Sequence, residues 1–306
     1  MKALVPTGQR RALVALADTG VPEPQPGEAL VKVEAFSVNR GEIFRLEDPR
    51  PGTRPGKDIA GLVVQAAADG TGPAAGQRVA GHPEAGGWAE YAAVPTTALA
   101  PLPDCVPAVQ AAALPLAGLT ALRLLRSAGS VAGRRILLTG ASGGVGHYVT
   151  EMAANSGADI TAVTASAERG ERLAALGAAA VVHDIGASAG PFDLVLESTG
   201  GTSLALAVGR LAPAGTLIWF GQASRTPATL NFFDILGGPQ TVMIRSFAYW
   251  DSPVPYGRDL AVLLRLVATG RLHPEIGRLA GWEDAAATLT DLYERRIRGN
   301  AVLTIP

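Results

Sequence analysis

The most informative stretch of the chain is Thr139-Gly140-Ala141-Ser142-Gly143-Gly144-Val145-Gly146. It follows an apolar, strand-like run at 135–138 and opens a helix-compatible segment at 147–154. A glycine turn between a strand and a helix lets backbone N–H groups approach a diphosphate closely, and the helix N-terminus adds partial positive charge. The turn therefore predicts binding of a dinucleotide diphosphate by Ala141, Ser142, Gly143, Gly144 and Val145. The alternative is a glycine turn that binds no ligand.

A second strand is expected at 159–164, after a helix-length interval, as a βαβ unit requires. It ends at Thr164 without the acidic residue that normally receives an adenosine ribose 2′-hydroxyl. Ser166 and Arg169 follow instead, a hydroxyl and a cation that suit a 2′-phosphate. The pattern predicts NADPH as cofactor, bound in part by Thr164, Ser166 and Arg169. The alternative for Arg169 is a solvated charge at the start of a helix.

Composition limits the possible classes of protein. The chain has 306 residues, a net charge of −1 and only 17% charged residues, which argues against nucleic-acid binding and against a polybasic membrane anchor. Cys105 is the only cysteine, so an internal disulfide and a multi-cysteine zinc site are excluded. The N-terminus lacks a signal-peptide core, and the longest uncharged stretch, 105–122, is interrupted by proline and glycine. We expect a soluble, cytoplasmic protein.

The pattern of expected strands and helices changes near residue 108. Before it, short β-type runs at 29–36, 59–64 and 77–80 are separated by loops rich in proline and glycine, which predicts a compact, mostly β domain. After it, apolar strand runs alternate with helical segments, which predicts an α/β fold with a doubly wound parallel sheet. The six strands are expected at 135–138, 159–164, 180–183, 192–197, 215–220 and 241–245. Only 185–191 separates the third strand from the fourth, so we expect an extended crossing there rather than a helix. Two helices, 258–268 and 283–296, and a strand at 301–305 end the chain.

Several motifs, spread over nearly the whole chain, resemble one family. They are Ser37-Val38-Asn39-Arg40-Gly41-Glu42-Ile43, Pro55-Gly56-Lys57-Asp58-Ile59-Ala60-Gly61, Gly86-Gly87-Trp88-Ala89-Glu90-Tyr91, Leu114-Pro115-Leu116-Ala117-Gly118-Leu119-Thr120-Ala121, the turn at 140–146, and Glu197-Ser198-Thr199-Gly200-Gly201. Together they resemble the medium-chain dehydrogenase/reductase superfamily, in its zinc-free quinone oxidoreductase (zeta-crystallin-like) branch.

The resemblance implies three segments: a GroES-like catalytic domain at 1–112, a Rossmann NADP-binding domain at 113–250, and a C-terminal return at 251–306 that completes the catalytic domain. It also implies that nicotinamide and substrate meet in a cleft between the domains. Relatives commonly form homodimers by pairing Rossmann edge strands, and 241–247 would be that edge. The alternative for this segment is an ordinary edge strand with no partner chain.

Zinc-dependent relatives place a cysteine near Asn39, Gly-His-Glu where Gly56-Lys57-Asp58 stands, and a four-cysteine lobe after the last strand of the front domain. None of these is present, and the four histidines have no ligand spacing. We therefore expect no metal. His147 is expected to pack or to face solvent, and His82, in a loop near the expected cleft, is a weak catalytic candidate.

Hydride addition to a quinone or an α,β-unsaturated carbonyl needs little from a metal-free protein, because conjugation already spreads the developing charge. The resemblance implies no obligate acid or base, with solvent delivering the second proton. We expect an NADPH-dependent reductase of this kind, with a small quinone or enone as substrate. The alternatives are an enoyl reductase acting on a thioester or biosynthetic intermediate, and an NADPH-binding sensor or RNA-binding accessory protein with little turnover.

The expected nicotinamide-end contacts come from several loops. Asn39 and Thr120 would orient the nicotinamide ribose or the substrate, although Asn39 could instead form a turn and Thr120 could bond to a helix carbonyl. The other predicted cofactor contacts follow strands or replace a family lysine: Ser198, Thr199, Phe220, Gly221, Gln222, Ser246, Phe247 and Asn300. Phe247 could equally be core, and Arg296 or Arg298 could replace the lysine that the family places near Asn300. Asp184, after the third strand, is unhelpful to a 2′-phosphate.

Overall fold

The computed structural model describes residues 1–9 and 12–306. The chain divides into two compact units, one formed by Met1–Leu119 with Pro253–Pro306 and the other by Thr120–Ser252. Each unit has its own sheet and is described separately. The roles expected for 1–112, 113–250 and 251–306 stay predictions. In the described part of the chain, no helix combines the length and the apolar character that crossing a membrane requires.

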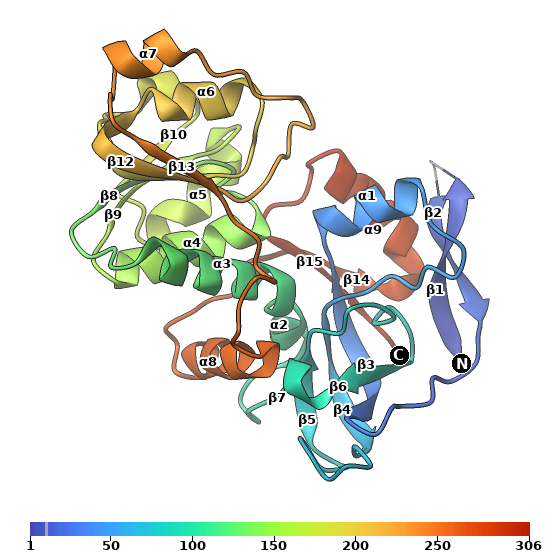
Figure 1. Ribbon diagram of the computed structural model, residues 1–306. Helices are drawn as coiled ribbons and strands as arrows, with labels where there is room; N and C mark the ends of the chain where they lie inside the picture. The colour runs from blue at the N-terminus through green and yellow to red at the C-terminus, as the bar shows by residue number, and fades with distance from the viewer. Residues whose placement is uncertain (10–11) are drawn as a thin grey trace. The chain divides into compact units, whose positions relative to one another are not determined.

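The second unit holds a six-stranded sheet in which every neighbouring pair is parallel. Its strands are β8 (Arg135–Leu138), β9 (Asp159–Val163), β10 (Ala180–Val182), β11 (Phe192–Glu197), β12 (Leu211–Trp219) and β13 (Met243–Ser246). The strand order is β10-β9-β8-β11-β12-β13 (Figure 1). The chain adds strands on one side of β8 and then on the other, as in a Rossmann sheet. Apolar strands such as β11 are buried along most of their length, because helices pack against the sheet. The expected α/β class with a doubly wound parallel sheet is confirmed.

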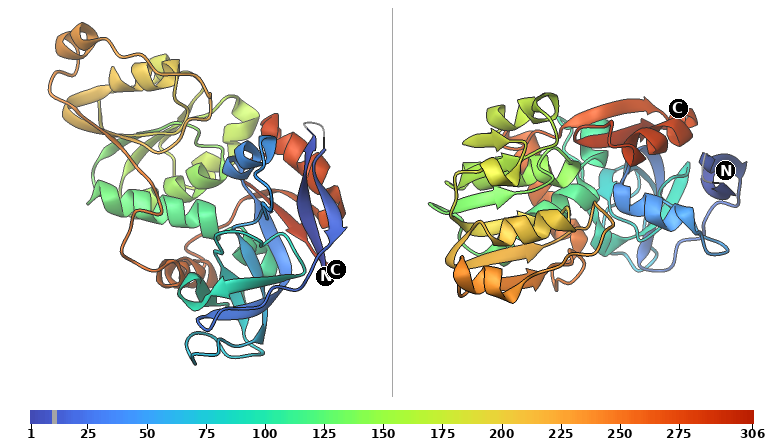
Figure 2. Two further views of the ribbon diagram at one scale, coloured as in Figure 1. Left: turned by 45° about the vertical axis from the view of Figure 1, so that its right-hand side comes forward. Right: turned by 90° about the horizontal axis from the view of Figure 1, so that it is seen from above.

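α3 (Pro115–Ala128) leads into β8, and the helices between the strands are α4 (Gly144–Asn155), α5 (Ala167–Ala175), α6 (Thr202–Val208) and α7 (Phe232–Gly237). They can be followed as the green-to-orange ribbon from two further directions in Figure 2. Between β10 and β11, residues 183–191 hold only the short 3-10 helix η2 (Ile185–Ala187), which agrees with the expected missing crossover helix. The sixth strand begins two residues later than expected, at Met243, where it meets Thr216 of β12 in parallel register.

The first unit is mostly β. β1 (Lys2–Gln9) and β2 (Ala12–Asp18) pair in antiparallel register as a two-stranded sheet, next to a seven-stranded sheet. That sheet consists of β3 (Glu28–Val38), β4 (Ile59–Gln65), β5 (Arg78–Gly81), β6 (Tyr91–Pro95), β7 (Leu99–Pro101), β14 (Ile276–Gly281) and β15 (Asn300–Thr304). Because β15 pairs with β3 in antiparallel register, the C-terminal segment joins the N-terminal sheet. Phe36 and Trp88 stack with ring centroids 5.8 Å apart in its core.

The remaining helical segments of this unit are α1 (Arg40–Glu47), η1 (Thr96–Ala98), α2 (Ala108–Ala112), α8 (Tyr256–Ala268), η3 (Trp282–Asp284) and α9 (Ala285–Tyr293). The segment between the expected β-type runs 29–36 and 59–64 was expected to be a loop, but 40–47 is helical. Asn39 is extended and precedes the helix, and the Glu42 carboxylate accepts the Asn39 backbone N–H over 2.9 Å. The last helix is shorter than expected because Arg295, just beyond it, has a left-handed φ of 60°.

Candidate functional site

The glycine turn follows β8 directly and leads into α4. Gly140 adopts φ +63°, and a Cβ at this position would lie 2.4 Å from the Ser198 hydroxyl. Gly146 lets the first turn of α4 approach the turn closely, because a Cβ there would lie 2.3 Å from the Ala141 carbonyl oxygen. The Ala141 N–H is held by the Val163 carbonyl at the end of β9. Thus two glycines allow the helix N-terminus, the turn and the strand end to meet.

The side chain of Arg169, near the start of α5, connects the segment after β9 to the glycine turn. Its guanidinium Nε donates to the Ser142 hydroxyl over 3.2 Å. Ser166 begins α5, and its hydroxyl accepts the Arg169 backbone N–H over 3.4 Å. The Thr164 carbonyl is 3.3 Å from His183 Nδ1, which follows β10. The predicted residues Ser142, Thr164, Ser166 and Arg169 therefore gather at one corner, where β8 and β9 end.

Asp184, which counts against a 2′-phosphate, is partly engaged elsewhere. It begins η2, and its carboxylate accepts the Gly186 N–H over 2.9 Å. This capping bond compensates part of the negative charge of Asp184 within its own turn.

The other predicted contacts of the second unit follow β11, β12 and β13 at the same edge of the sheet. The loop after β12 packs on the loop after β11, since Ala223 N–H donates to the Ser198 carbonyl over 2.9 Å and Ser224 N–H to the Thr199 carbonyl over 2.7 Å. Phe247 N–H donates to the Trp219 carbonyl over 3.0 Å, which carries the edge one strand further. This edge accordingly carries Ser198, Thr199, Phe220, Gly221, Gln222, Ser246 and Phe247. Such an edge is where doubly wound sheets bind ligands.

Sequence reasoning missed Glu197, the last residue of β11. Its side chain is fully buried, and its carboxylate accepts hydrogen bonds from Thr139, Thr199, Gly200 and Ser203. The available signal was an acidic residue directly after the apolar run 194–196 and next to the glycine-rich segment 198–201.

In the first unit, Asn39 belongs to a buried polar cluster around Asp58. The Asp58 carboxylate accepts from Ser37 Oγ at 2.6 Å, Asn39 Nδ2 at 2.6 Å and the Leu116 backbone N–H at 2.9 Å, and it lies 3.1 Å from His82 Nδ1. Asn39 Nδ2 is also 3.2 Å from the Ser37 hydroxyl. Since both amide hydrogens point into the cluster, donation to a substrate carbonyl would require these bonds to break.

Glu42 lies beside this cluster and is buried. Its carboxyl group accepts the backbone N–H of Asn39 and, over 3.0 Å, that of Gly56. Burial, followed by the nearby Asp58 carboxylate, raises the pKa of Glu42 from 4.5 to about 8. Glu42 and Asp58 are thus neighbouring buried carboxyl groups with different environments.

The structure places the remaining candidates as follows. Thr120 is buried in α3, and Asn300 is the first residue of β15, where its amide donates to the Glu275 carbonyl over 3.1 Å. His147 is buried with Nδ1 2.9 Å from the Gly143 carbonyl, in agreement with the expected packing role. His82 is also buried, with its ring edge-on to Tyr256 at 4.8 Å.

Two arginines considered as replacements for the family lysine pair with acidic side chains. Arg296 Nε donates to the Asp291 carboxylate over 2.9 Å, and Arg298 Nε donates to the Glu275 carboxylate over 3.0 Å. Both arginines therefore have roles in holding the C-terminal segment together.

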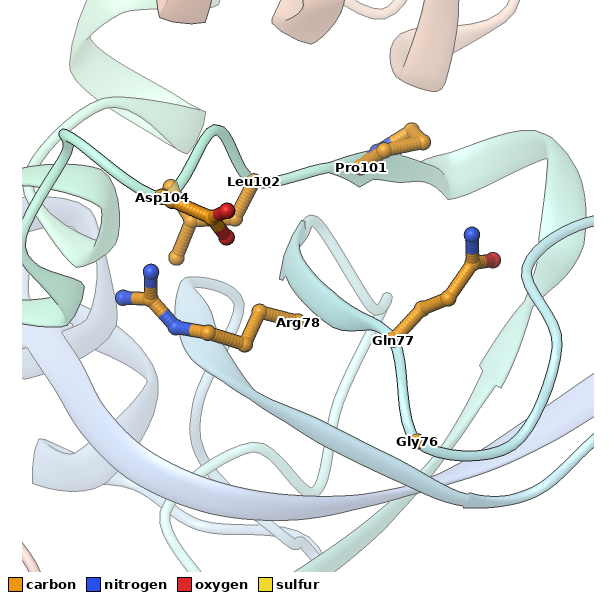
Figure 3. A pocket seen from close by; sticks show the side chains of 6 residues that line it. All are labelled: Gly76, Gln77, Arg78, Pro101, Leu102 and Asp104. Atoms are coloured by element: carbon orange, nitrogen blue, oxygen red, sulfur yellow. The ribbon is translucent and has the colours of Figure 1, made fainter.

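A hollow lies elsewhere on the first unit, beside the start of β5 and the end of β7, and is lined by Gly76, Gln77, Arg78, Pro101, Leu102 and Asp104. Figure 3 shows Arg78 and Gln77 extending in opposite directions from adjacent positions. Arg78 Nη2 donates to the Val106 carbonyl over 3.1 Å, which fixes the neighbouring loop. The hollow shares no residue with the predicted site, so we do not assign the chemistry to it.

Across residues 1–9 and 12–306, no group of three or more His, Cys, Asp or Glu side chains is arranged to hold a metal ion. The Asp58 cluster contains carboxylates and one imidazole, but its carboxylates are engaged by protein N–H and O–H donors.

Two domain families match the chain. Residues 25–104 match the alcohol dehydrogenase GroES-like domain, and residues 144–257 match the zinc-binding dehydrogenase domain. They fall on the mostly β unit and on the Rossmann sheet respectively, and the expected GroES-like architecture is confirmed.

Among curated proteins, the chain is 32% identical over 293 residues to the spectinabilin polyketide synthase system protein NorB of Streptomyces orinoci, covering 92% of this chain and 13% of NorB. It is 32% identical to the 2-methylene-furan-3-one reductase of Solanum lycopersicum, covering 65% of this chain and 59% of that protein. It is 29% identical to the quinone oxidoreductase of Sus scrofa, covering 94% and 92%. The chain thus spans less than two thirds of the length of the first two relatives.

Among solved structures, a mycobacterial protein complexed with NADPH superposes with a TM-score of 0.89 at 26% identity, covering 100% of both chains. The Escherichia coli quinone oxidoreductase superposes equally well, with a TM-score of 0.89 over 99% of both chains, but its 20% identity shows the fold alone. From its two domain matches, its relatives and its fold, we conclude that the chain belongs to the medium-chain dehydrogenase/reductase superfamily, in the quinone oxidoreductase-like branch.

Proposed function

We propose that this chain is an NADPH-dependent reductase that transfers hydride to a quinone or another α,β-unsaturated carbonyl without a metal ion. The observation that carries the cofactor assignment is the contact between Arg169 and Ser142. It joins a cation after β9 to the glycine turn after β8, where the adenosine ribose of a dinucleotide lies in Rossmann domains. A guanidinium at that corner favours a 2′-phosphate over a free 2′-hydroxyl.

The residues present also fit a diphosphate. The N-terminus of α4, a helix of 12 residues, follows the turn, and Gly143 precedes its first residue. Helix N-termini attract phosphate because their backbone N–H groups are unsatisfied and the helix dipole is positive there. Gly140 and Gly146 supply the close approach that side chains would prevent.

In the proposed reaction, the residues of the chain bind and orient the cofactor and the acceptor. A bound reduced nicotinamide supplies the hydride, and the β carbon of the conjugated acceptor receives it. Negative charge then develops on the acceptor oxygen and is spread by conjugation, so a proton from solvent completes the reduction. The carboxyl-end loops of the parallel sheet hold the cofactor, and Asn39 and Thr120 remain proposed orienting residues.

The activities of the relatives support this proposal. One is a quinone oxidoreductase and another reduces 2-methylene-furan-3-one, and the mycobacterial structure contains NADPH. The similarity to NorB, a polyketide synthase system protein, favours the second candidate, an enoyl reductase acting on a biosynthetic thioester.

One experiment separates the candidates. The purified chain is mixed with NADPH or NADH, binding is titrated by nicotinamide fluorescence, and oxidation is followed with quinones, enones and enoyl thioesters. Reduction of quinones or enones supports the leading proposal, and reduction of thioesters alone supports the alternative. Tight NADPH binding without oxidation by any of these acceptors would instead indicate a sensor or accessory protein.

We also propose a homodimer through the Rossmann edge strand. β13 ends the sheet, and two of its apolar side chains, Met243 and Ile244, are 59% and 36% exposed. The neighbouring segment α7 adds Phe232 at 68% and Phe233 at 76% exposure. An exposed apolar edge strand invites pairing with a second copy, because its backbone N–H and C=O groups need partners.

A further inference from the structure

Glu197 occupies an unusual position for a carboxylate. It ends β11 with a fully buried side chain. Oε1 accepts from Thr139 Oγ1 at 3.1 Å, the Thr199 N–H at 2.9 Å and Ser203 Oγ at 3.0 Å. Oε2 accepts the Gly200 N–H over 2.9 Å. A buried carboxylate with this many donors is stabilised within the fold, and each donor is fixed in return.

The donors come from three separate segments of the chain. Thr139 lies between β8 and the glycine turn, while Thr199 and Gly200 form the loop after β11. Ser203 belongs to the first turn of α6. The bonds of Glu197 therefore set the spacing between the glycine turn, the loop at 198–201 and the start of α6.

Ser198 reinforces the same arrangement. Its N–H donates to Thr139 Oγ1 over 2.9 Å, and its hydroxyl donates to the Thr139 carbonyl over 3.0 Å. The Ser198 hydroxyl oxygen is also only 2.4 Å from the position that a Cβ on Gly140 would occupy. Because the two loops touch so closely, a displacement of the loop after β11 is transmitted to the glycine turn.

We infer that Glu197 is a positioning residue for the nicotinamide cofactor, acting through these two loops rather than by contact. This inference rests on the proposed function. It predicts an effect on NADPH and NADH alike, because the 2′-phosphate is recognised at Arg169, on the loop after β9. The carboxylate is required because it only accepts hydrogen bonds, whereas a glutamine amide would turn an N–H₂ group toward at least one of the four donors.

The test compares Glu197→Gln with Asp193→Asn. Asp193 lies in the same strand, and its carboxylate accepts the Arg135 N–H over 2.8 Å at the amino end of β8. It thus controls for loss of a strand-to-strand bond away from the cofactor edge. We expect Glu197→Gln to raise the Kd for NADPH and for NADH by roughly tenfold or more, and Asp193→Asn to leave both within about twofold. Thermal unfolding of both variants reports any general loss of stability.

A folded Glu197→Gln protein that binds both cofactors like wild type would overturn the inference, as would equal weakening by Asp193→Asn. Should Glu197→Gln fail to fold, Thr139→Val and Thr139→Ser provide the same test. Removal of the hydroxyl should weaken binding of both cofactors, and the serine variant should restore it; equal binding by the two would also contradict the inference. Wild-type protein that takes up neither cofactor would refute the proposed function itself, which is a separate result.

Discussion

The guanidinium of Arg169 donates to the hydroxyl of Ser142 over 3.2 Å, and this bond joins the loops that follow β9 and β8. A backbone hydrogen bond joins the same two loops, because the Ala141 N–H donates to the Val163 carbonyl at the end of β9. Arg169 is therefore placed by the parallel register of two strands rather than by the flexibility of a surface side chain. The proposed preference for NADPH depends on this placement.

Replacement of Arg169 by alanine should discriminate between the two cofactors. Loss of a charge-assisted contact to the 2′-phosphate should weaken NADPH binding by roughly ten- to hundredfold and leave NADH binding unchanged. Arg172→Ala is the matched control, since it removes an equal charge from the same helix. Equal loss for both cofactors, or no loss for NADPH, would show that the 2′-phosphate is not recognised at Arg169. Isothermal titration of each variant with each cofactor provides the measurement.

Two glycines in helices should respond in opposite ways to alanine. Gly146→Ala places a methyl group 2.3 Å from the Ala141 carbonyl oxygen, so α4 must move away from the turn. We expect a loss of about 1–3 kcal/mol in unfolding free energy and a loss of NADPH binding. Gly41→Ala in α1 meets no atom within 4 Å and should gain about 0.4–1 kcal/mol with unchanged binding. Chemical denaturation with and without NADPH measures both; a tolerant Gly146 would contradict the close approach.

Glu42 should make stability depend on pH. Its pKa is raised in the folded protein to about 8, against 4.5 when solvated, so the folded state keeps a proton that the unfolded state has lost. Its contribution to stability is therefore complete below pH 4.5 and is lost as the pH rises through 8. Glu42→Gln, which cannot ionise, should lack this decline, so its stability relative to wild type should rise between these pH values. Parallel curves from urea denaturation across this range would contradict the raised pKa.

The edge strand should determine the oligomeric state. Met243→Lys places a charge on exposed β13 and should convert a dimer into a monomer, because edge lysines oppose strand pairing. Leu279→Lys is the control: Leu279 is 56% exposed on β14, the edge strand of the other sheet. Size-exclusion chromatography with light scattering measures both variants. A wild-type monomer, or a dimer that survives Met243→Lys, would argue against the proposed interface.

The sequence was sufficient for the sheet and for the corner at its cofactor edge. The six strands of the second unit were predictable because each is a short apolar run, and the parallel order follows from the βαβ connection around 140–146. Since the carboxyl ends of parallel strands share an edge, residues after β8 and β9 could be placed together before their contacts were known. Ser142 and Arg169 are an example, 27 residues apart in the chain and joined by a hydrogen bond.

Other features depend on contacts that no local pattern carries. Asp58, His82 and Leu116 are far apart in sequence and converge only because β4, the end of β5 and the start of α3 pack together. The helix at 40–47 was also missed, because the segment has few apolar residues and its first turn is capped by Glu42. Glu197 was overlooked for the same reason, because its donors lie on three separate segments.

Hydride transfer under metal-free conditions is the most direct test of the proposed reaction. The protein is treated with a strong chelator and desalted, and a stoichiometric amount of NADPH is added, followed by a quinone or an enone. The loss of NADPH absorbance is then followed in a single turnover. If the reaction needs no metal ion, NADPH should be oxidised rapidly, at a rate equal to that of untreated protein. Oxidation that stops after chelation and returns only with a divalent metal ion would contradict the proposed reaction.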